Sequence, residues 1–463
     1  MKVLMFGWEF PPHISGGLGT ACYGLTSALV KEPLEIIFVV PKLYGNEPDN
    51  GITLVNASEV STPQRTSAQY THDETITPTD LYPEHTTTRD GITTIEIPSS
   101  LSAYTMAGID LVYDLQHWNY EQTEKNVEPV TDHHEKHGST IITSQDQTYE
   151  FKGGYGEQLI EEVYRYAQVG AKLAEQYNVD VIHAHDWMTF PAAIAAKKTS
   201  GKPLVVHVHA TEYDRAGKHG NPNVYNIEKE AVMQADRVIA VSRWTKDLLV
   251  KNYRIRASKI DVVHNGIIPQ VTSDMNKEAA IHAIGKQVVT FLGRITYQKG
   301  PEYFVEAAKK VSERFPDAHF IMAGSGDFLP QIISMVAKFK LSSRFHFTGF
   351  LRKLEMDTIL SYTRVYVMPS VSEPFGITPL EAVQAGVPVI ISNQSGVGEV
   401  MGHALKVDFW DTDALSQAIC SVLQYKSLSD TLKKNSAEEI NTVTWDKAAK
   451  KLNLIYHELT STI

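Results

Sequence analysis

The sequence predicts an α/β protein made of two Rossmann-like domains, each built on a parallel sheet, that face each other across a cleft. The chain has 463 residues, whereas a single hydrophobic core stops growing at roughly 250 to 300 residues, so two large domains are expected. Continuous runs of Val and Ile alternate with segments of helical periodicity, which is typical of parallel sheets covered by helices on both faces. This βα pattern occurs twice along the chain.

The first series opens with a strand, a loop rich in Pro and Gly, and a helical segment. Between about residues 44 and 150 the pattern dissolves into Thr, Pro, Asp and Asn, which we interpret as an insertion. We therefore predict a first domain over 1–266 that carries an insertion at about 44–150. Its strands are expected at Val3–Phe6, Glu35–Val40, Val179–Ala184, Pro203–His209, Arg237–Val241 and Ile260–His264.

The second series follows a polar stretch between Gly266 and Lys286, where we place the domain boundary. The second domain is predicted over 267–435. A last helical segment, Trp445–Leu459, falls within 436–463 and is expected to pack across the boundary. The strands of the second series are expected at Gln287–Gly293, His319–Gly324, Arg344–Gly349, Val365–Pro369 and Val387–Ser392.

Composition excludes several classes of function. The net charge is −11, and Lys and Arg are scattered, which argues against a nucleic-acid partner. Apolar runs stay short of the about 18 residues that a membrane span needs, so integral membrane association is not expected and the default address is cytoplasmic. Cys22 and Cys420 lie far apart inside apolar helical patterns, which indicates core thiols, with neither a disulfide framework nor a zinc knuckle.

The loop Ser15–Thr20 stands between the first strand and the first helix. Its glycines, Gly16 and Gly17, would let backbone amides approach a phosphate at the positive end of the helix. The stretch matches neither the GxGxxG nor the Walker pattern, and a flexible turn explains it equally well.

Two cations lie at the carboxyl edge of the second predicted sheet, where ligands of open α/β sheets bind. Arg294 follows a strand directly, and Lys299 precedes the next helix. A planar guanidinium and a mobile ammonium could together stabilise a departing diphosphate without a metal ion. A pair of solvated loop cations is the competing interpretation.

Two glutamates stand eight positions apart in the segment Ser372–Glu381. Thr378 and Glu381 fit a capping box with Pro at the first helical position, which would give Glu381 a structural role. Glu373 lies in the loop ahead and has no evident structural duty. In a fully helical segment the carboxylates would be roughly 12 Å apart, beyond the about 5 to 9.5 Å of a glycosidase pair, so a hydrolytic pair is disfavoured.

Two His-x-His pairs end successive predicted strands, and alternation places each pair on one face. With a nearby carboxylate such as Asp186, the imidazoles could bind zinc or manganese. They could equally donate hydrogen bonds to a sugar, and the inner His183 and His207 are expected to be buried structural residues. The pairs are His183 with His185 and His207 with His209.

Two further polar clusters are not expected to bind metal. The cluster Asp132–His137 lies in a polar stretch and should be solvated. Asp411 and Asp413 are interpreted as part of a helix cap.

With these motifs in place, the chain resembles the retaining glycosyltransferases of the GT-B fold, in the large family 4 group that includes glycogen and starch synthases and sucrose synthases. The matching motifs occur in the expected order over nearly the whole chain. They are GGLG at 16–19, HAHDW at 183–187, HVHATEYDR at 207–215, HNGI at 264–267, GRITYQKG at 293–300 and EPFGITPLE at 373–381.

This resemblance implies a role for each candidate residue in binding a nucleotide-sugar donor, mainly on the second domain, with the acceptor on the side of the first. Arg294 and Lys299 would bind the diphosphate, Glu381 the ribose, and Glu373 the hydroxyls of the transferred sugar. The first domain would lend the backbone amides of Gly16 and Gly17, while Asp186 and His209 would lie near the sugar. The donor-binding segment would also include Phe375, Gly376, Ile377 and Thr378.

The same resemblance implies a reaction that retains the anomeric configuration. The departing phosphate would help to deprotonate the acceptor on the same face, so no protein nucleophile, metal ion or other cofactor is expected. The expected activity is transfer of a hexose, glucose in the first place, to a glucan.

The sequence departs from the best-known bacterial glycogen synthases at one place, since they carry Lys two positions before the paired glycines and Ile14 stands here. The donor is therefore left open between ADP-glucose, UDP-glucose and a GDP-sugar. Alternative products are an exopolysaccharide, a glycolipid or a small glycoside. A metal-dependent hydrolase using the paired histidines is an alternative of another class. Retention of Arg294, Lys299 and both glutamates argues against a non-catalytic binding protein.

Overall fold

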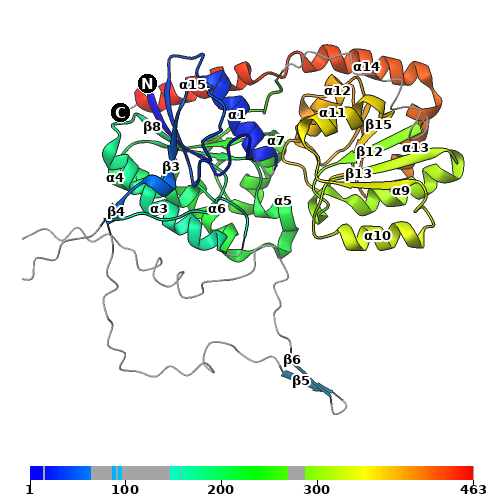
Figure 1. The fold of residues 1–463 in the computed structure, drawn as a ribbon, viewed down its shortest axis with the longest axis horizontal. Coiled ribbons are helices and arrows are strands. Elements are labelled where there is room, and N and C mark those ends of the chain that lie inside the picture. The colour runs from blue at the N-terminus through cyan, green and yellow to red at the C-terminus, as the bar shows by residue number, and fades with distance from the viewer. Residues whose placement is uncertain are drawn as a thin grey trace, which may run out of the picture.

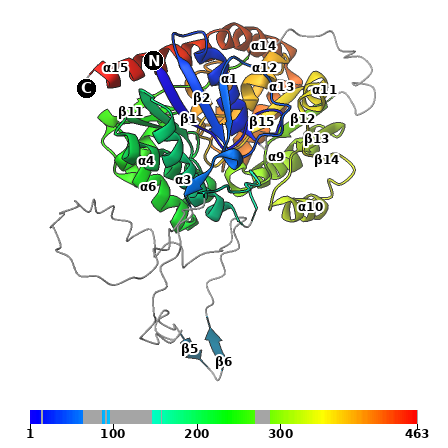
Figure 2. The same ribbon diagram turned by 60° about the vertical axis from the view of Figure 1, so that its left-hand side comes forward.

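The computed structural model describes residues 1–13, 16–63, 86–89, 92–95, 146–156, 158–268 and 287–461. Two α/β halves follow each other along the chain, each around its own sheet (Figure 1). The turned view shows helices on both sides of the strands in each half (Figure 2). This arrangement is the predicted pair of Rossmann-like domains.

The first sheet has seven parallel strands in the order β11-β10-β9-β8-β1-β2-β3. The chain winds from β1 outwards to β3, returns to β8 on the other side of β1, and winds outwards again. This is the doubly wound order of a Rossmann fold. The strands are β1 (Lys2–Phe6), β2 (Glu35–Val40), β3 (Thr53–Asn56), β8 (Val181–His185), β9 (Leu204–Val208), β10 (Arg237–Ala240) and β11 (Ile260–Val262).

The second sheet repeats this winding with six parallel strands in the order β14-β13-β12-β15-β16-β17. Its direction of winding reverses between β12 and β15, as that of the first sheet does between β1 and β8. The strands are β12 (Gln287–Leu292), β13 (Ala318–Ala323), β14 (Phe345–Gly349), β15 (Val365–Met368), β16 (Val389–Ser392) and β17 (Leu405–Val407).

Helices cover both faces of each sheet. Those of the first half are α1 (Gly17–Leu29), α3 (Leu159–Gln176), α4 (Phe190–Ser200), α5 (Glu212–Ala216), α6 (Pro222–Gln234) and α7 (Arg243–Leu248). Those of the second are α9 (Pro301–Arg314), α10 (Leu329–Lys338), α11 (Lys353–Tyr362), α12 (Thr378–Gln384), α13 (Thr412–Gln424) and α14 (Lys426–Ile440), followed by α15 (Trp445–Ser461). No helix among the described residues is both long enough and apolar enough to cross a bilayer.

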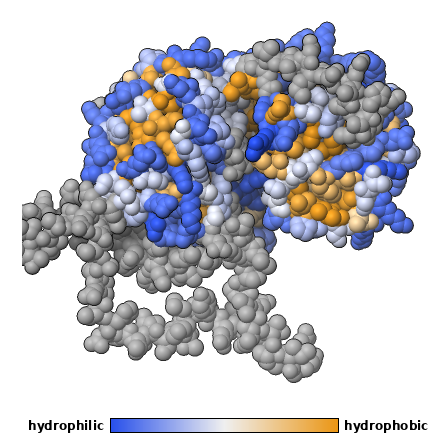
Figure 3. Space-filling view, in the orientation of Figure 1, coloured by the Kyte–Doolittle hydropathy of each residue, from blue (hydrophilic) through white to orange (hydrophobic). Residues whose placement is uncertain are grey.

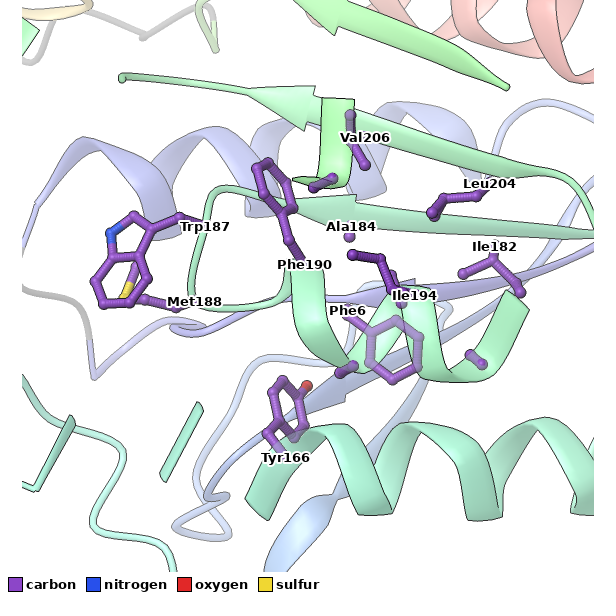
Figure 4. Close-up of a cluster of buried hydrophobic side chains, with 14 of the residues drawn as sticks. Phe6, Tyr166, Ile182, Ala184, Trp187, Met188, Phe190, Ile194, Leu204 and Val206 are labelled. Carbon is purple, nitrogen blue, oxygen red and sulfur yellow. The ribbon is translucent and has the colours of Figure 1, made fainter. Parts of the chain in front are cut away.

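Alternation along β1 divides the core of the first domain between the two faces of the sheet. Leu4 and Phe6 join the cluster under α3 and α4, whereas Val3 and Met5 face α1 and α15. Figure 4 shows Phe6 between Tyr166 of α3 and the side chains of the neighbouring strand and of α4. Both faces are apolar, which explains why the strand is a continuous hydrophobic run.

The last helix, α15, leaves the second half and packs on the first, where it lies against α1. Figure 1 shows it in red over the first sheet, while α14 lies over the second. The indole of Trp445 sits so close to α1 that a Cβ on Gly24 would lie 2.3 Å from its Nε1. A Cβ on Gly266 would lie 2.1 Å from the amide nitrogen of Trp445. The lack of a side chain at these two glycines therefore leaves the space that Trp445 occupies.

The predicted insertion at about 44–150 begins too early. Thr53–Asn56 forms the edge strand β3, which pairs in parallel with β2 at Ile37↔Thr53. A half-buried edge strand does not need a continuous hydrophobic run, so its sequence resembles a loop. Beyond it, β4 (Thr62–Pro63) pairs antiparallel with β7 (Asp146–Gln147), and β5 (Thr86–Arg89) with β6 (Ile92–Ile95).

Candidate functional site between the domains

The candidate residues gather where each sheet reverses its winding. The loop after β1 leads to Gly16 and Gly17, and β8 ends at His185, which Asp186 follows. In the second domain, β12 leads to Arg294, and the loop after β15 leads to Glu373. Ligands of open α/β sheets bind in the crevice at such reversal points, outside the carboxyl ends of the strands.

On the second domain, the ammonium of Lys299 forms an ion pair with the Glu373 carboxylate, and both side chains are largely buried. Ser370 Oγ donates a further hydrogen bond of 3.1 Å to Glu373 Oε2. Gly300, with φ of +61°, allows this close approach, since a Cβ there would lie 2.3 Å from the carbonyl oxygen of Pro369. The loops after β12 and β15 are thereby joined at the ion pair.

Arg294 is exposed, and its guanidinium is oriented by a buried amide that the sequence analysis did not single out. Arg294 Nη2 donates to Gln298 Oε1 at 3.3 Å, and Gln298 Nε2 donates to the carbonyl oxygen of Ser372 at 3.1 Å. Gln298 is only 3% exposed. It therefore connects the cation to the loop that carries Glu373.

The predicted capping box at the start of α12 is wrong. Thr378 is the first residue of the helix, and the N-cap is Ile377, which makes no side-chain hydrogen bond. Glu381 instead lies 3.7 Å from Lys353 Nζ through its Oε1. Burial raises the pKa of Glu381, while Lys353 acts in the opposite direction. Glu381 therefore lacks the helix-capping role that the sequence suggested.

The side chain of Phe375 is unavailable to a ligand. Its ring is 2% exposed and packs in the core of the second domain. Any contact of Phe375 with a donor would have to come from the main chain. Gly376, the next residue, has φ of +97°, a conformation that favours glycine.

On the first domain, α1 begins with an open N-terminus. Gly16 is the N-cap and makes no side-chain cap, and a Cβ on Gly16 or Gly17 would meet none of the residues that the structure describes within 4 Å. The first amides of a helix lack partners within the helix and favour an anion. The space and the donors for a phosphate or a sugar hydroxyl are both present here.

Asp186 ties the ends of β8 and β9 together, because its Oδ1 accepts hydrogen bonds from the amides of His209 and Ala210 at 2.7 and 3.2 Å. Arg215 approaches its Oδ2 at 3.5 Å. The residue has φ of +61°, which is uncommon for a residue with a side chain. With its oxygens engaged in this way, Asp186 positions the loop of His209.

The four histidines form one stacked group on the first sheet. His183 and His185 stack at 4.5 Å between ring centroids, and His207 and His209 at 4.3 Å. His185 Nδ1 lies 2.9 Å from His209 Nε2, and His183 Nδ1 contacts the Tyr456 hydroxyl of α15. His183 and His207 are fully buried, as predicted, whereas His209 is partly exposed.

Burial keeps these imidazoles neutral. It lowers the pKa of His183 to about 3, with a smaller contribution from repulsion by His209. Burial likewise lowers the pKa of His209, against the attraction of Asp186. Neutral imidazoles can bind a metal ion, and two trios have ligand atoms within 4.8 Å of one another: Cys22 with His185 and His209, and His183 with His185 and His207. Asp186, whose charge acts on His209, is already engaged with backbone amides.

The two cysteines and one of the two further polar clusters of the sequence lie among the described residues. Cys22 and Cys420 are buried thiols. Asp411 caps α13 by accepting from the amide of Ala414, as predicted. The cluster at 132–137 lies outside the described residues.

Direct hydrogen bonds join the two domains beside this site. Ser372 Oγ donates to Asp214 Oδ1 at 2.5 Å and accepts from Trp244 Nε1 at 3.2 Å. Ser242 Oγ donates to the carbonyl oxygen of Pro374 at 2.5 Å. These bonds hold the loop of Glu373 against the first domain. In Figure 3, hydrophilic side chains line the furrow where the two halves meet.

A carboxylate of the second domain also binds the start of α7 in the first. The two oxygens of Glu399 accept from the amides of Arg243 and Trp244 at 3.0 and 2.9 Å, and His264 Nε2 lies 2.8 Å from Oε2. Burial alone would raise the pKa of Glu399, but these hydrogen bonds outweigh it and lower the pKa. No sequence motif indicated this contact.

Comparison with known families identifies the class of protein. Residues 274–439 match the glycosyl transferases group 1 family, and residues 151–271 match glycosyltransferase family 4. An uncharacterized glycosyltransferase of Methanocaldococcus jannaschii is 30% identical over 293 residues, which cover 60% of this chain and 75% of that protein. The chain belongs to the family 4 type of glycosyltransferases.

More specific relatives are further away. Glycogen synthase of Mycobacterium tuberculosis is 24% identical over 408 residues, covering 87% of this chain and 80% of that protein. Sucrose-phosphate synthase of Thermosynechococcus elongatus superposes with a TM-score of 0.67 at 18% identity and covers both chains fully. HepE of Anabaena, in complex with UDP and glucose, gives 0.64 at 14%, covering 99% of this chain and all of that one. These structures confirm the predicted GT-B fold.

Proposed function

We propose that the chain is a retaining hexosyltransferase that moves glucose from a nucleotide diphosphate sugar to a glucan. The observation that carries this proposal is the group formed by Arg294, Lys299 and Glu373 at the reversal point of the second sheet. Across the furrow it faces the first domain, whose own reversal point offers the open N-terminus of α1 and the partly exposed His209. Cations on one side and hydrogen-bonding groups on the other suit a donor with a diphosphate and a sugar.

The Lys299–Glu373 ion pair suggests how the donor binds, namely by an exchange of partners at Lys299. An arriving diphosphate would replace Glu373 as the partner of Lys299, because the diphosphate of a nucleotide sugar carries two negative charges and the carboxylate carries one. Glu373, still bonded to Ser370 at 3.1 Å, would then accept hydrogen bonds from the hydroxyls of the transferred sugar. Arg294, oriented by Gln298, would hold the second phosphate in its planar fork.

In the proposed reaction the bond between the anomeric carbon and the diphosphate oxygen breaks, and the leaving nucleotide keeps the electron pair. Arg294 and Lys299 stabilise the charge that develops on this oxygen. The acceptor hydroxyl attacks the same face and gives its proton to the departing phosphate. The enzyme contributes no nucleophile, and the anomeric configuration is retained.

Glucose and glucan rest on the resemblance to glycogen synthase and on the 24% identical relative of that name. An α-maltose-1-phosphate synthase of Mycolicibacterium smegmatis, 31% identical over 69% of its length, is consistent with an α-glucosyl product. The base of the donor is left open between adenine, uracil and guanine.

The proposal is tested by incubating the protein with ADP-, UDP- and GDP-sugars, with and without glycogen, and measuring the nucleotide released. Release that depends on glycogen, with an α-linked product detected by proton NMR, is the expected result. Release from no donor under any acceptor condition, or an inverted product, would refute it.

A further inference from the structure

A hollow of about 1000 Å³ opens on the first domain, at residues that the proposed reaction does not use. Three tyrosines, Tyr213, Tyr225 and Tyr253, line it. Their rings pack against one another, with centroids 4.9 to 5.8 Å apart. Tyr225 donates its hydroxyl to the carbonyl oxygen of Asn252 at 3.2 Å, and Tyr253 donates to Glu228, so both rings are fixed in place.

Four cations line the same hollow: Lys229, Arg254, Arg256 and Lys259. None of the described residues that line it carries a carboxylate. Lys229 lies over the ring of Tyr225 at 5.9 Å, and Lys259 donates to the carbonyl oxygen of Met233 at 2.7 Å. Within the described part of the chain, neither Arg254 nor Arg256 has an ion-pair partner. In a chain with a net charge of −11, this local excess of cations is distinctive.

Tyrosine faces and unpaired guanidinium groups suit a saccharide that carries acidic groups. The C–H faces of sugar rings pack against aromatic rings, and Tyr213 and Tyr225 are partly exposed in the hollow, whereas Tyr253 is buried beneath them. Arginine binds carboxylates and phosphates through paired hydrogen bonds. The volume exceeds what a lone anion would fill and is in the range of sites for larger ligands.

We propose that this hollow is a second carbohydrate-binding site, for a glycan that carries carboxylate or phosphate groups. The inference rests on the proposed function for the carbohydrate nature of the ligand, and goes beyond it by adding acidic groups and a second place of binding.

The hollow and the furrow between the domains share structural elements. On α5, Tyr213 lines the hollow, and the next residue, Asp214, accepts the hydrogen bond from Ser372 of the second domain. Beneath the hollow, Tyr253 donates to Glu228, and Glu228 accepts from Arg215 at 3.0 Å. Arg215 in turn approaches Asp186 at 3.5 Å. A glycan held in the hollow would therefore be bound on elements that are connected, through Glu228 and Arg215, to Asp186.

The test measures binding by calorimetry, without a nucleotide sugar, so that it does not depend on the donor assignment. The probes are hexagalacturonate, a phosphorylated maltohexaose, unmodified maltohexaose and vesicles of phosphatidylglycerol. We expect one or both acidic oligosaccharides to bind more tightly than maltohexaose. The double variant Lys229→Ala with Arg256→Ala should weaken that binding on the order of tenfold or more, and Tyr225→Leu should weaken it as well.

The matched control removes two exposed cations of the second domain, Lys338→Ala with Lys434→Ala, and should leave binding unchanged. Nucleotide release with a short neutral acceptor should be the same in all variants, which also reports that they are folded. Equal binding of neutral and acidic oligosaccharides, or equal loss in the control, would overturn the proposal. Vesicles binding in preference to both acidic oligosaccharides, or no binding by any probe, would do the same.

Discussion

Ser372 of the second domain donates a hydrogen bond of 2.5 Å to Asp214 of the first. Asp214 is 1% exposed, and burial raises the pKa of its carboxyl, while the bond from Ser372 acts in the opposite direction. The neighbour of Ser372 in the chain is Glu373, which pairs with Lys299. Ser372 therefore joins the two domains, and the next residue, Glu373, belongs to the candidate donor site.

Arg294→Ala and Lys299→Ala are each expected to lower turnover by on the order of 100-fold or more, because each removes a charge aimed at the leaving diphosphate. Steady-state rates of nucleotide release measure this effect. Lys338→Ala, which removes an exposed charge of the same domain, is the control. Near wild-type rates in both variants would show that the diphosphate binds elsewhere.

Glu381→Ala should weaken nucleotide binding, on the order of tenfold, if Glu381 accepts hydrogen bonds from the ribose. Calorimetric titration with the nucleotide diphosphate measures the dissociation constant. Glu355→Ala tests the specificity of the effect, since Glu355 only caps the start of α11 in the same domain. An unchanged dissociation constant for Glu381→Ala would remove this residue from the site.

Activity should survive treatment with EDTA, because Arg294, Lys299 and the amides of α1 can neutralise the leaving group. The assay is nucleotide release before and after removal of metal, together with the metal content of the purified protein. Complete loss, reversed by zinc or manganese, would instead favour the hydrolase alternative built on the histidines near Cys22.

Nucleotide binding should compact the molecule in solution scattering, because the groups that we assign to the donor are divided between the domains. The hydrogen bond from Ser372 to Asp214 should contribute to the compact state, so Ser372→Ala should reduce the change in radius of gyration. Ser361→Ala, whose hydroxyl bonds only within α11, is the matched control. A radius that is the same with and without saturating nucleotide in the wild type would contradict domain closure.

Glu228 should contribute stability at about pH 5 that is lost by about pH 7. The four stacked histidines act in the opposite sense over this range, because their lowered pKa values make stability rise with pH. Burial raises the pKa of Glu228 from 4.5 to about 7, although Arg215 and Tyr253 act in the opposite direction. Between these values Glu228 binds more protons in the folded state than in the unfolded state, so raising the pH removes stability at this group, on the order of 3 kcal/mol. Thermal melts across this range measure the slope.

Glu228→Gln should remove this contribution, so the stability of the variant should rise more steeply with pH than that of the wild type, whatever its value at a single pH. Glu230→Gln, on the exposed side of the same helix, should leave the slope as it is. A slope that is identical in all three proteins would assign the pH dependence to other groups.

The parts of the molecule that the sequence predicted are those coded by local pattern. Uninterrupted Val and Ile runs indicated both sheets, and the position of Arg294 directly after a predicted strand placed it at the carboxyl edge of the second sheet. Local chemistry also sufficed for the cap at Asp411. The edge strand β3 was not predicted, because a half-buried strand needs no continuous apolar run.

Contacts between distant segments were not predictable in this way. Gln298, Ser372 and Glu399 act through partners that only the folded chain brings near, and glutamine or serine in a loop is too common to stand out. The supposed capping box at Thr378 shows the reverse error, since the spacing fitted a motif that the backbone does not form.

The position of α15 has a consequence for how the protein is made. The ribosome delivers this helix after both sheets, yet its Trp445 and Tyr456 complete the core of the first domain, and Tyr456 contacts His183. During synthesis, the apolar groove beside α1 therefore stays exposed to solvent until the whole second domain has emerged. The half that is translated first is thus finished last, and the nascent chain depends on its second half to fold without aggregating.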